Sequence, residues 1–191
     1  MNNVKFQNQY RIPPARANWH DYNGGNYFIT ICTKNREHYF GEIANDEMML
    51  SKVGCFLSNN LENISTHYPY AEIPLFVIMP NHLHAIICID TPCRDEACLV
   101  SDKNKTPIGD EACLVSTTNP MKDISNRQSL LSKCIGGIKS AITRYANQNN
   151  ITFSWQTRFH DRIIRDNNEM NAFADYIENN VLNWALDSEF L

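Results

Sequence analysis

The chain has 191 residues and a mass of 22.0 kDa, which suits a single domain; 43% of its residues are hydrophobic and 20% are charged. This composition excludes a wholly disordered chain, a collagen-like chain and a coiled coil. No apolar run approaches the roughly 20 residues of a membrane-spanning helix, and residues 1–6 contain no apolar signal-peptide core. We therefore expect a cytoplasmic protein without a membrane partner.

The formal net charge of −4 hides two basic segments. Before Asp21 the chain has only basic charges, and residues 133–165 contain six basic residues against Asp161 alone. Residues 166–191 contain acidic charges only. Local charge decides phosphate binding, so these segments are compatible with a nucleic-acid surface, and equally with a solvated helix face.

Two strands and a helix are predicted first. Residues 27–32 (YFITIC) are apolar and β-branched and follow two glycines, which is typical of a buried strand; residues 48–50 suggest a short second strand. Ser51 is a good N-cap for a helix running to about residue 66. Its apolar face consists of Val53, Phe56, Leu57, Leu61 and Ile64.

Residues 75–79 and 82–89 predict two further strands, interrupted by Pro80-Asn81. Because side chains alternate along a strand, two sets of residues from 82–89 should lie on opposite faces. One set is His82, His84, Ile86 and Cys88, and the other is Leu83, Ala85, Ile87 and Ile89.

An insertion interrupts the pattern at residues 91–125, where the segment DEACLVS occurs twice, 15 residues apart. Two copies at this period do not make a solenoid, so we expect a duplicated, mobile loop without a catalytic role. The predicted organisation is a basic tail (1–20), one domain (21–90 and 126–191) and this inserted loop. The seven scattered cysteines contain no C-x-x-C pair, so neither a zinc ribbon nor a disulfide framework fits well.

A long helix is predicted over residues 126–147, with Leu131, Ile135, Ile138, Ile142 and Tyr145 on one face. Gly136-Gly137 inside it indicates close packing or a late helix start. Extended segments at 151–155 and 159–165 precede a last amphipathic helix that ends near residues 179–180. This order of elements predicts an α+β sandwich with a mostly antiparallel sheet.

His82 and His84 are the strongest candidates for a functional site. Two residues apart on a strand, they present two imidazoles on one face, which suits a single divalent metal ion. Hydrogen-bonded histidines without a metal are the alternative. An apolar strand around them favours function, because buried imidazoles need partners.

Tyr145 is the candidate nucleophile. A tyrosine beside a metal ion can attack a phosphodiester, and the face of the long helix that packs on the sheet carries Tyr145. Core packing is the alternative role for this residue.

Residues 155–165 interleave aromatic and arginine side chains, which suits base stacking and phosphate contacts as well as a packed strand. The candidate DNA-binding residues in these two segments are Lys139, Arg144, Arg158, Arg162 and Arg165.

Several motifs together resemble the REP-associated tyrosine transposases of the HUH endonuclease superfamily. They are MPNHLH at 79–84, Lys139-Ser140, FxWQxRFHDxIIR at 153–165 and YIxNN at 176–180. Upstream, YFITICTxNR at 27–36 and FGEI at 40–43 match the same family. The resemblance covers nearly the whole chain except the tail and the insertion.

The resemblance implies a ferredoxin-like α+β sandwich in which His82 and His84 hold Mg²⁺ or Mn²⁺. It also implies that a tyrosine on the following long helix cuts single-stranded, hairpin-forming DNA, leaving a 5′-phosphotyrosine and a free 3′-OH. Relatives act as monomers or dimers, so a homodimer is open. Arg11 and Arg16 of the tail are expected to contact DNA near the hairpin foot.

One departure from the family pattern concerns the nucleophile. Many relatives have Lys-Ser-Tyr-Thr where this chain has Lys139-Ser140-Ala141-Ile142. We expect Tyr145, one turn later, to replace the missing tyrosine, and Gln148 (or Asn149) to complete the metal site. Two alternatives remain: a transposase-derived DNA-binding protein that has lost its chemistry, and a metal-dependent RNA nuclease.

Overall fold

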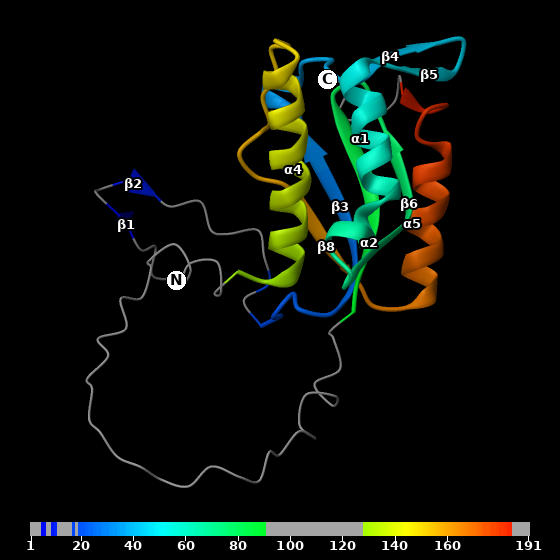
Figure 1. The fold of residues 1–191 in the computed structure, drawn as a ribbon. Coiled ribbons are helices and arrows are strands. Elements are labelled where there is room, and N and C mark those ends of the chain that lie inside the picture. Colours follow the sequence, from blue (N-terminus) through cyan, green and yellow to red (C-terminus); the bar gives the residue numbers. More distant parts are fainter. Residues whose placement is uncertain (1–4, 7–8, 11–16, 18, 91–127, 185–191) are drawn as a thin grey trace, which may run out of the picture.

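The computed structural model describes residues 5–6, 9–10, 17, 19–90 and 128–184 (Figure 1). Its centre is a four-stranded antiparallel sheet with the strand order β6-β7-β3-β8. The strands are β3 (Gly25–Cys32), β6 (Ala71–Ile78), β7 (His82–Ile89) and β8 (His160–Ile164). Both parts of the predicted domain thus contribute to one sheet. Arg11, Arg16 and the insertion at 91–125 lie outside the described residues.

Helices alternate with these strands along the chain. Helix α1 (Lys52–Glu62) comes between β3 and β6, followed by the short α2 (Ile64–His67), and α4 (Leu130–Gln148) comes between β7 and β8. This βαββαβ order with its strand arrangement is ferredoxin-like, as the family resemblance implies. Helix α5 (Asn167–Asn179) follows β8 and packs against β6 and β7. No helix in the described ranges is long and apolar enough to cross a membrane.

The two faces of the sheet carry separate apolar cores. The larger core joins the sheet to α1 and α4 and includes Tyr27, Ile29, Leu83 and Ile138. The smaller core lies under α5 and contains Ile86, Ile164 and Ile177. The alternation predicted for residues 82–89 is therefore confirmed: the odd-numbered side chains enter the larger core, and the even-numbered ones, including both histidines, face α5.

Smaller elements lie outside the central sheet and its helices. The strand predicted at 48–50 is β5 (Glu47–Leu50). It forms a hairpin with β4 (Gly41–Ala44), a strand that was not predicted. A 3₁₀ turn, η1 (Lys34–Arg36), follows β3. Residues 151–155 form no strand, only an isolated bridge between Trp155 and Thr33. The N-terminal strands are β1 (Lys5–Phe6) and β2 (Gln9–Tyr10).

The helix starts follow local capping chemistry. The Ser51 hydroxyl accepts a hydrogen bond from the Gly54 amide at 3.1 Å, and Ser129 likewise caps α4, which begins four residues later than predicted. The close packing predicted for the glycine pair holds for Gly137 alone. A Cβ there would clash with the Tyr68 hydroxyl oxygen, whereas a Cβ on Gly136 would meet nothing within 4 Å.

Candidate active site

The two predicted metal-binding histidines lie together at the end of β7. His82 and His84 are 0% and 3% exposed, and their Nε2 atoms lie 3.0 Å apart. They face α5 because even-numbered β7 residues point away from the larger core. The strand therefore directs both imidazoles to one point, as the spacing predicts.

Each imidazole is held by a hydrogen bond at its other nitrogen. His82 Nδ1 lies 2.7 Å from Asn81 Oδ1, and His84 Nδ1 lies 2.9 Å from Thr30 Oγ1. An Nδ1–H that donates to these oxygens leaves the Nε2 lone pair available as a ligand. Thr30 is correctly placed because β3 pairs with β7 in a register that sets it opposite His84.

Burial keeps His82 uncharged. It lowers the pKa of His82 to about 2, with smaller contributions from His84 and from the Arg36 guanidinium. A neutral imidazole is the form that binds metal. Aromatic rings surround the pair: Phe28 stacks on His84 with centroids 5.3 Å apart, and Trp184 stacks on His82 at 6.0 Å.

A tyrosine reaches this site from α5. The Tyr176 hydroxyl oxygen lies 3.3 Å from His84 Nε2, and the side chain is 43% exposed, so its hydroxyl sits beside the imidazole pair without being sealed off. Helix α5 begins at Asn167 after the N-cap Asp166, whose carboxylate accepts from the Glu169 amide, and the Glu169 carboxylate accepts from the Arg165 amide. These two hydrogen bonds fix the start of the helix that carries Tyr176.

Asn180 follows one turn after Tyr176 and so lies on nearly the same side of α5. Its side chain is 3% exposed, and its Oδ1 is the one buried side-chain polar atom, among the described residues, without a hydrogen-bond partner. A buried amide oxygen without a donor is energetically costly. It is a group that a cation could satisfy.

These residues fit a divalent ion with oxygen and imidazole ligands. Two ligand atoms that bind one metal ion at right angles to each other, each about 2.1 Å from the ion, lie about 3.0 Å apart. The two Nε2 atoms have this separation. Within the described ranges, no group of three His, Cys, Asp or Glu side chains could hold a metal. Among the described residues, a third protein ligand would therefore be of another type, such as the amide oxygen of Asn180.

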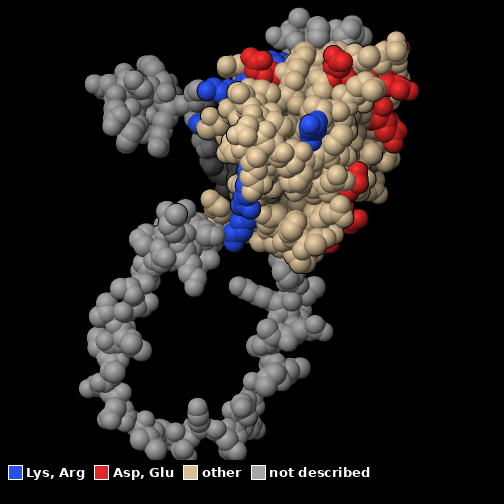
Figure 2. Space-filling model, turned by 45° about the horizontal axis from the view of Figure 1, so that its top comes forward, with Lys and Arg blue, Asp and Glu red and all other residues tan. Residues whose placement is uncertain are grey.

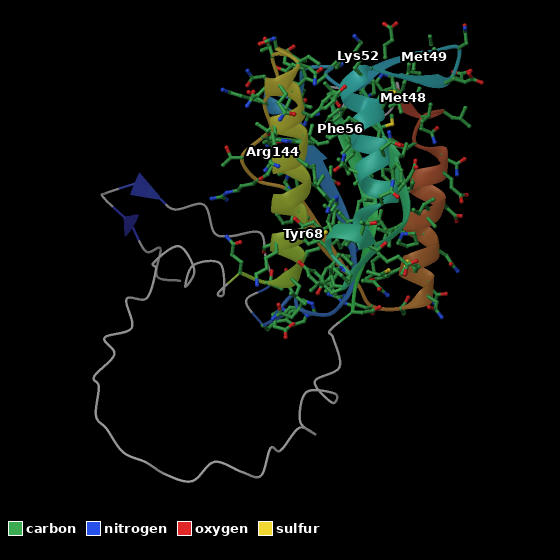
Figure 3. All side chains as sticks on the ribbon, viewed as in Figure 1. Met48, Met49, Lys52, Phe56, Tyr68 and Arg144 are labelled. Carbon is green, nitrogen blue, oxygen red and sulfur yellow. The ribbon has the colours of Figure 1, made fainter. Side chains whose placement is uncertain are left out.

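The predicted nucleophile Tyr145 lies elsewhere. Its ring stacks on Phe56 with centroids 4.0 Å apart, between α4 and α1, where Figure 3 places Phe56. Helix α4 covers the face of the sheet opposite His82 and His84, so the structure does not bring Tyr145 to the imidazole pair. Gln148, the predicted third ligand, is exposed on the same helix, and Asn149 follows it. Neither one joins the site.

The predicted DNA-binding residues divide into two groups. Lys139 Nζ donates to the Gln156 carbonyl at 2.6 Å and is half-buried, which lowers its pKa, so this residue ties α4 to the loop before β8. The Arg162 guanidinium lies over the Phe173 ring at 5.5 Å. The predicted residues that are exposed to solvent are Arg144, Arg158, Arg162 and Arg165.

Charge is unevenly distributed over the surface. On the face seen in Figure 2, Lys and Arg gather mainly toward one side and Asp and Glu mainly toward the other. Helix α5 and the segment after it, to residue 184, carry acidic residues and no Lys or Arg. Contacts with a polyanion are therefore favoured on the side away from the outer surface of α5.

Tyr176 and Asn180 are the site residues that the sequence analysis did not assign. Both belong to the YIxNN motif at 176–180, which it counted only toward the family resemblance. The signal was present: a tyrosine and an amide, four residues apart on one helix, accompany a pair of histidines. What the spacing could not specify was the face of the sheet on which each helix packs.

A solved transposase structure shares this architecture. No family model matches the chain. A REP-associated tyrosine transposase, solved bound to a REP hairpin, superimposes with a TM-score of 0.51 at 19% identity, covering 92% of this chain and 73% of that one. A transposase-like protein from Deinococcus radiodurans gives a TM-score of 0.36 at 15% identity, over 82% and 90% of the two chains.

The fold is thus that of a REP-associated tyrosine transposase, as the motifs predict. At the level of sequence, a Haemophilus influenzae protein described as uncharacterized is 35% identical over 168 residues, which are 87% of this chain and 86% of that protein. The chain belongs to the family of that Haemophilus protein.

Proposed function

We propose that the protein is a metal-dependent endonuclease and strand transferase that acts on single-stranded, hairpin-forming DNA. Tyr176 is the nucleophile, and His82 and His84 hold Mg²⁺ or Mn²⁺ through their Nε2 atoms with Asn180 Oδ1 as a third ligand. The observation that carries this proposal is the 3.3 Å separation between the Tyr176 hydroxyl oxygen and His84 Nε2, in a site where both Nδ1 atoms are already engaged.

The reaction needs a tyrosine that a DNA strand can reach. Tyr176 Oη gives up its proton and forms the new bond to phosphorus; the bond from phosphorus to the 3′ oxygen breaks, and that oxygen takes up a proton. The products are a 5′-phosphotyrosine and a free 3′-OH, and attack by another 3′-OH reverses the steps and joins strands. A bound divalent ion supplies Lewis-acid polarisation of the phosphate and offsets its developing charge.

Surrounding side chains position the reacting groups. Thr30 and Asn81 fix the imidazole orientations, and Phe28 packs between His84 and Phe173, its ring centroids lying 5.3 Å and 4.4 Å from theirs. Partial exposure leaves the Tyr176 hydroxyl accessible to a flexible single strand.

Hairpin DNA as the substrate class rests on two supports. The REP-associated tyrosine transposase with this fold was solved bound to a REP hairpin, and on the face seen in Figure 2 the Lys and Arg side chains of this chain gather mainly on the side away from the acidic residues. The non-catalytic alternative rested on Ala141. Ala141 belongs to α4, on the face of the sheet away from the histidines, so it does not bear on chemistry at the imidazole pair.

The test is a strand-cleavage assay with an end-labelled hairpin oligonucleotide and Mn²⁺, resolved on a denaturing gel. The wild-type protein should form a covalent adduct, Tyr176→Phe should lose it, and Tyr145→Phe should retain it. Tyr145→Phe is the matched control because it removes the same hydroxyl from a stacked ring on the other face. An adduct that survives Tyr176→Phe would refute the assigned nucleophile.

A further inference from the structure

A cavity lies between α1, α2 and α4, on the face of the sheet opposite the two imidazoles. Its volume is about 650 Å³, which falls in the usual range of small-ligand pockets, roughly 300–1,000 Å³. Figure 3 labels three residues of its lining, namely Phe56 on α1, Tyr68 at the end of α2 and Arg144 on α4. The chemistry proposed above uses none of these three side chains.

The shape of the cavity follows from side-chain size on α4 and from ring packing between the helices. Gly137 lets the Tyr68 hydroxyl approach the α4 backbone, and Ala141, one turn later, is a second small residue of the lining. Phe56 stacks on Tyr145 with centroids 4.0 Å apart and an interplanar angle of 8°, and both rings line the cavity. The ring pair ties α1 to α4, while the small residues leave the space beside it unfilled.

The lining combines an apolar floor with one cation at the rim. Ile64 and Ile138 are buried and belong to the larger core, so they form the floor. Arg144 is exposed and is the only Lys or Arg of the lining, which contains no Asp or Glu. Among the described residues, Arg144 has no ion-pair partner. An anion with an apolar body would match both parts of the lining.

Two further polar groups of the lining can bind a ligand. The Asn60 side-chain nitrogen donates to the Phe56 carbonyl at 2.8 Å, which leaves the Asn60 side-chain oxygen as an acceptor. The Tyr68 hydroxyl has no hydrogen-bond partner in the described part of the chain. Burial raises the pKa of Tyr68, so its hydroxyl keeps the proton and can donate.

The charge of the lining favours a carboxylate with a single charge. One guanidinium group binds one carboxylate through two parallel hydrogen bonds. A nucleoside di- or triphosphate would bring several charges, and the lining holds no second Lys or Arg to balance them. The buried isoleucines and the stacked rings favour an apolar body, because they remove apolar surface from water.

We propose that this cavity binds a small apolar monocarboxylate, such as an aromatic acid, with its carboxylate on Arg144 and its body against Ile64 and Ile138. It is a second site of the protein, on the sheet face away from the two imidazoles. The proposal does not depend on the chemistry assigned to Tyr176. It gives Arg144, predicted from the sequence to contact DNA, a role in binding a small molecule.

The test compares two probes of nearly the same shape, hydrocinnamate and its neutral amide, by NMR titration of the isotope-labelled full-length protein at neutral pH. Hydrocinnamate should bind with a Kd in the millimolar range or tighter, as expected for a ligand of this size. It should bind at least about tenfold more tightly than the amide, because only the acid can pair with the guanidinium. The backbone amide signals of Gly137 and Ala141 should shift, and those of β8 should not.

Arg144→Gln should abolish the preference for the acid while leaving the affinity for the amide unchanged. Its matched control is Lys52→Gln, which removes the same charge from an exposed position on α1 that does not line the cavity (Figure 3). The control should keep the preference.

Filling the cavity should abolish binding of both probes. Ala141→Leu adds bulk inside the lining, and Ser140→Leu does so from an exposed position that leaves the core undisturbed. Gly136→Ala adds bulk to the same helix outside the lining and should keep both affinities. Circular dichroism confirms that each variant folds.

Several outcomes would overturn the proposal. Equal affinity for the acid and the amide would refute recognition of the carboxylate. Binding of hydrocinnamate that survives both leucine substitutions, or signal shifts at His82 and His84 in place of α4, would refute the cavity as the site. Absence of saturable binding to the wild-type protein would refute the ligand class. The DNA adduct assay is scored separately, so its failure would leave this result standing.

Discussion

The hydroxyl oxygen of Tyr176 lies 3.3 Å from Nε2 of His84, although 92 residues separate the two in the chain. The contact exists because α5 packs on the sheet face that carries the even-numbered side chains of β7. It brings a tyrosine hydroxyl to two imidazoles, on the helix that one turn later carries Asn180, whose buried amide oxygen has no partner among the described residues.

Metal binding should depend on the histidine pair. Replacing His84 with alanine removes one of the two imidazole ligands and should weaken Mn²⁺ binding by at least about 100-fold, measured by titration calorimetry. Mn²⁺ should raise the Tm of the wild-type protein, because a ligand that binds only the folded state stabilises it, and should leave the Tm of His84→Ala unchanged. His67→Ala, at an exposed position on α2, is the control. Equal Mn²⁺ affinity in both variants would refute the metal site.

Thr30 should act through His84. Thr30→Val keeps the shape of the side chain but removes the hydroxyl partner of Nδ1, and it should weaken Mn²⁺ binding about 10- to 100-fold. Thr30→Ser restores the hydroxyl and should recover most of the affinity. A loss of affinity that serine does not rescue would indicate a packing effect instead of an orienting hydrogen bond.

Substitution of Asn180 distinguishes a role in metal binding from a role in stability. Its buried Oδ1 has no partner in the described part of the chain, and an unsatisfied buried acceptor costs about 1–3 kcal/mol. Asn180→Leu should therefore weaken Mn²⁺ binding while leaving the metal-free protein no less stable in urea. If the leucine variant instead unfolds more easily and binds Mn²⁺ normally, Asn180 has a structural role only.

Alanine substitutions at the two neighbouring glycines of α4 should change the free energy of unfolding in opposite directions. Gly136→Ala meets no neighbour and should stabilise the protein by up to about 1 kcal/mol, because alanine is the better helix former. Gly137→Ala places a methyl group against Tyr68 and should destabilise it by about 1–3 kcal/mol. Urea denaturation measures both changes in the free energy of unfolding. In a protein that already carries Tyr68→Ala, Gly137→Ala should lose most of its destabilising effect.

Much of the fold could be predicted because it follows local patterns. The alternation at 82–89 correctly separated the two faces of β7, and the apolar stripe through Leu131, Ile135 and Ile138 predicted α4. Strand β4 was missed because its hairpin is peripheral, and its side chains contact little that would impose an apolar pattern. Residues 151–155 are apolar but enter the core from an irregular segment.

The site was only half predictable, for a topological reason. His82 and His84 follow from their spacing on one strand, whereas the choice between Tyr145 and Tyr176 depends on which sheet face each helix covers. Both tyrosines lie in phase with an apolar stripe. The one available clue was that the fully apolar face of β7 needs the two interleaved helices, which leaves the histidine face to the helix after β8.

The central claim, that Tyr176 is the nucleophile, is tested most directly by locating the covalent DNA adduct in the wild-type protein. Trypsin cuts after Arg144, Arg158 and Arg165, so Tyr145 and Tyr176 fall in different peptides, 145–158 and 166–191, each with a single tyrosine. After reaction with hairpin DNA and Mn²⁺ and nuclease trimming, mass spectrometry should find the nucleotide mass on peptide 166–191, at Tyr176. An adduct on peptide 145–158 would contradict the account and return the chemistry to α4.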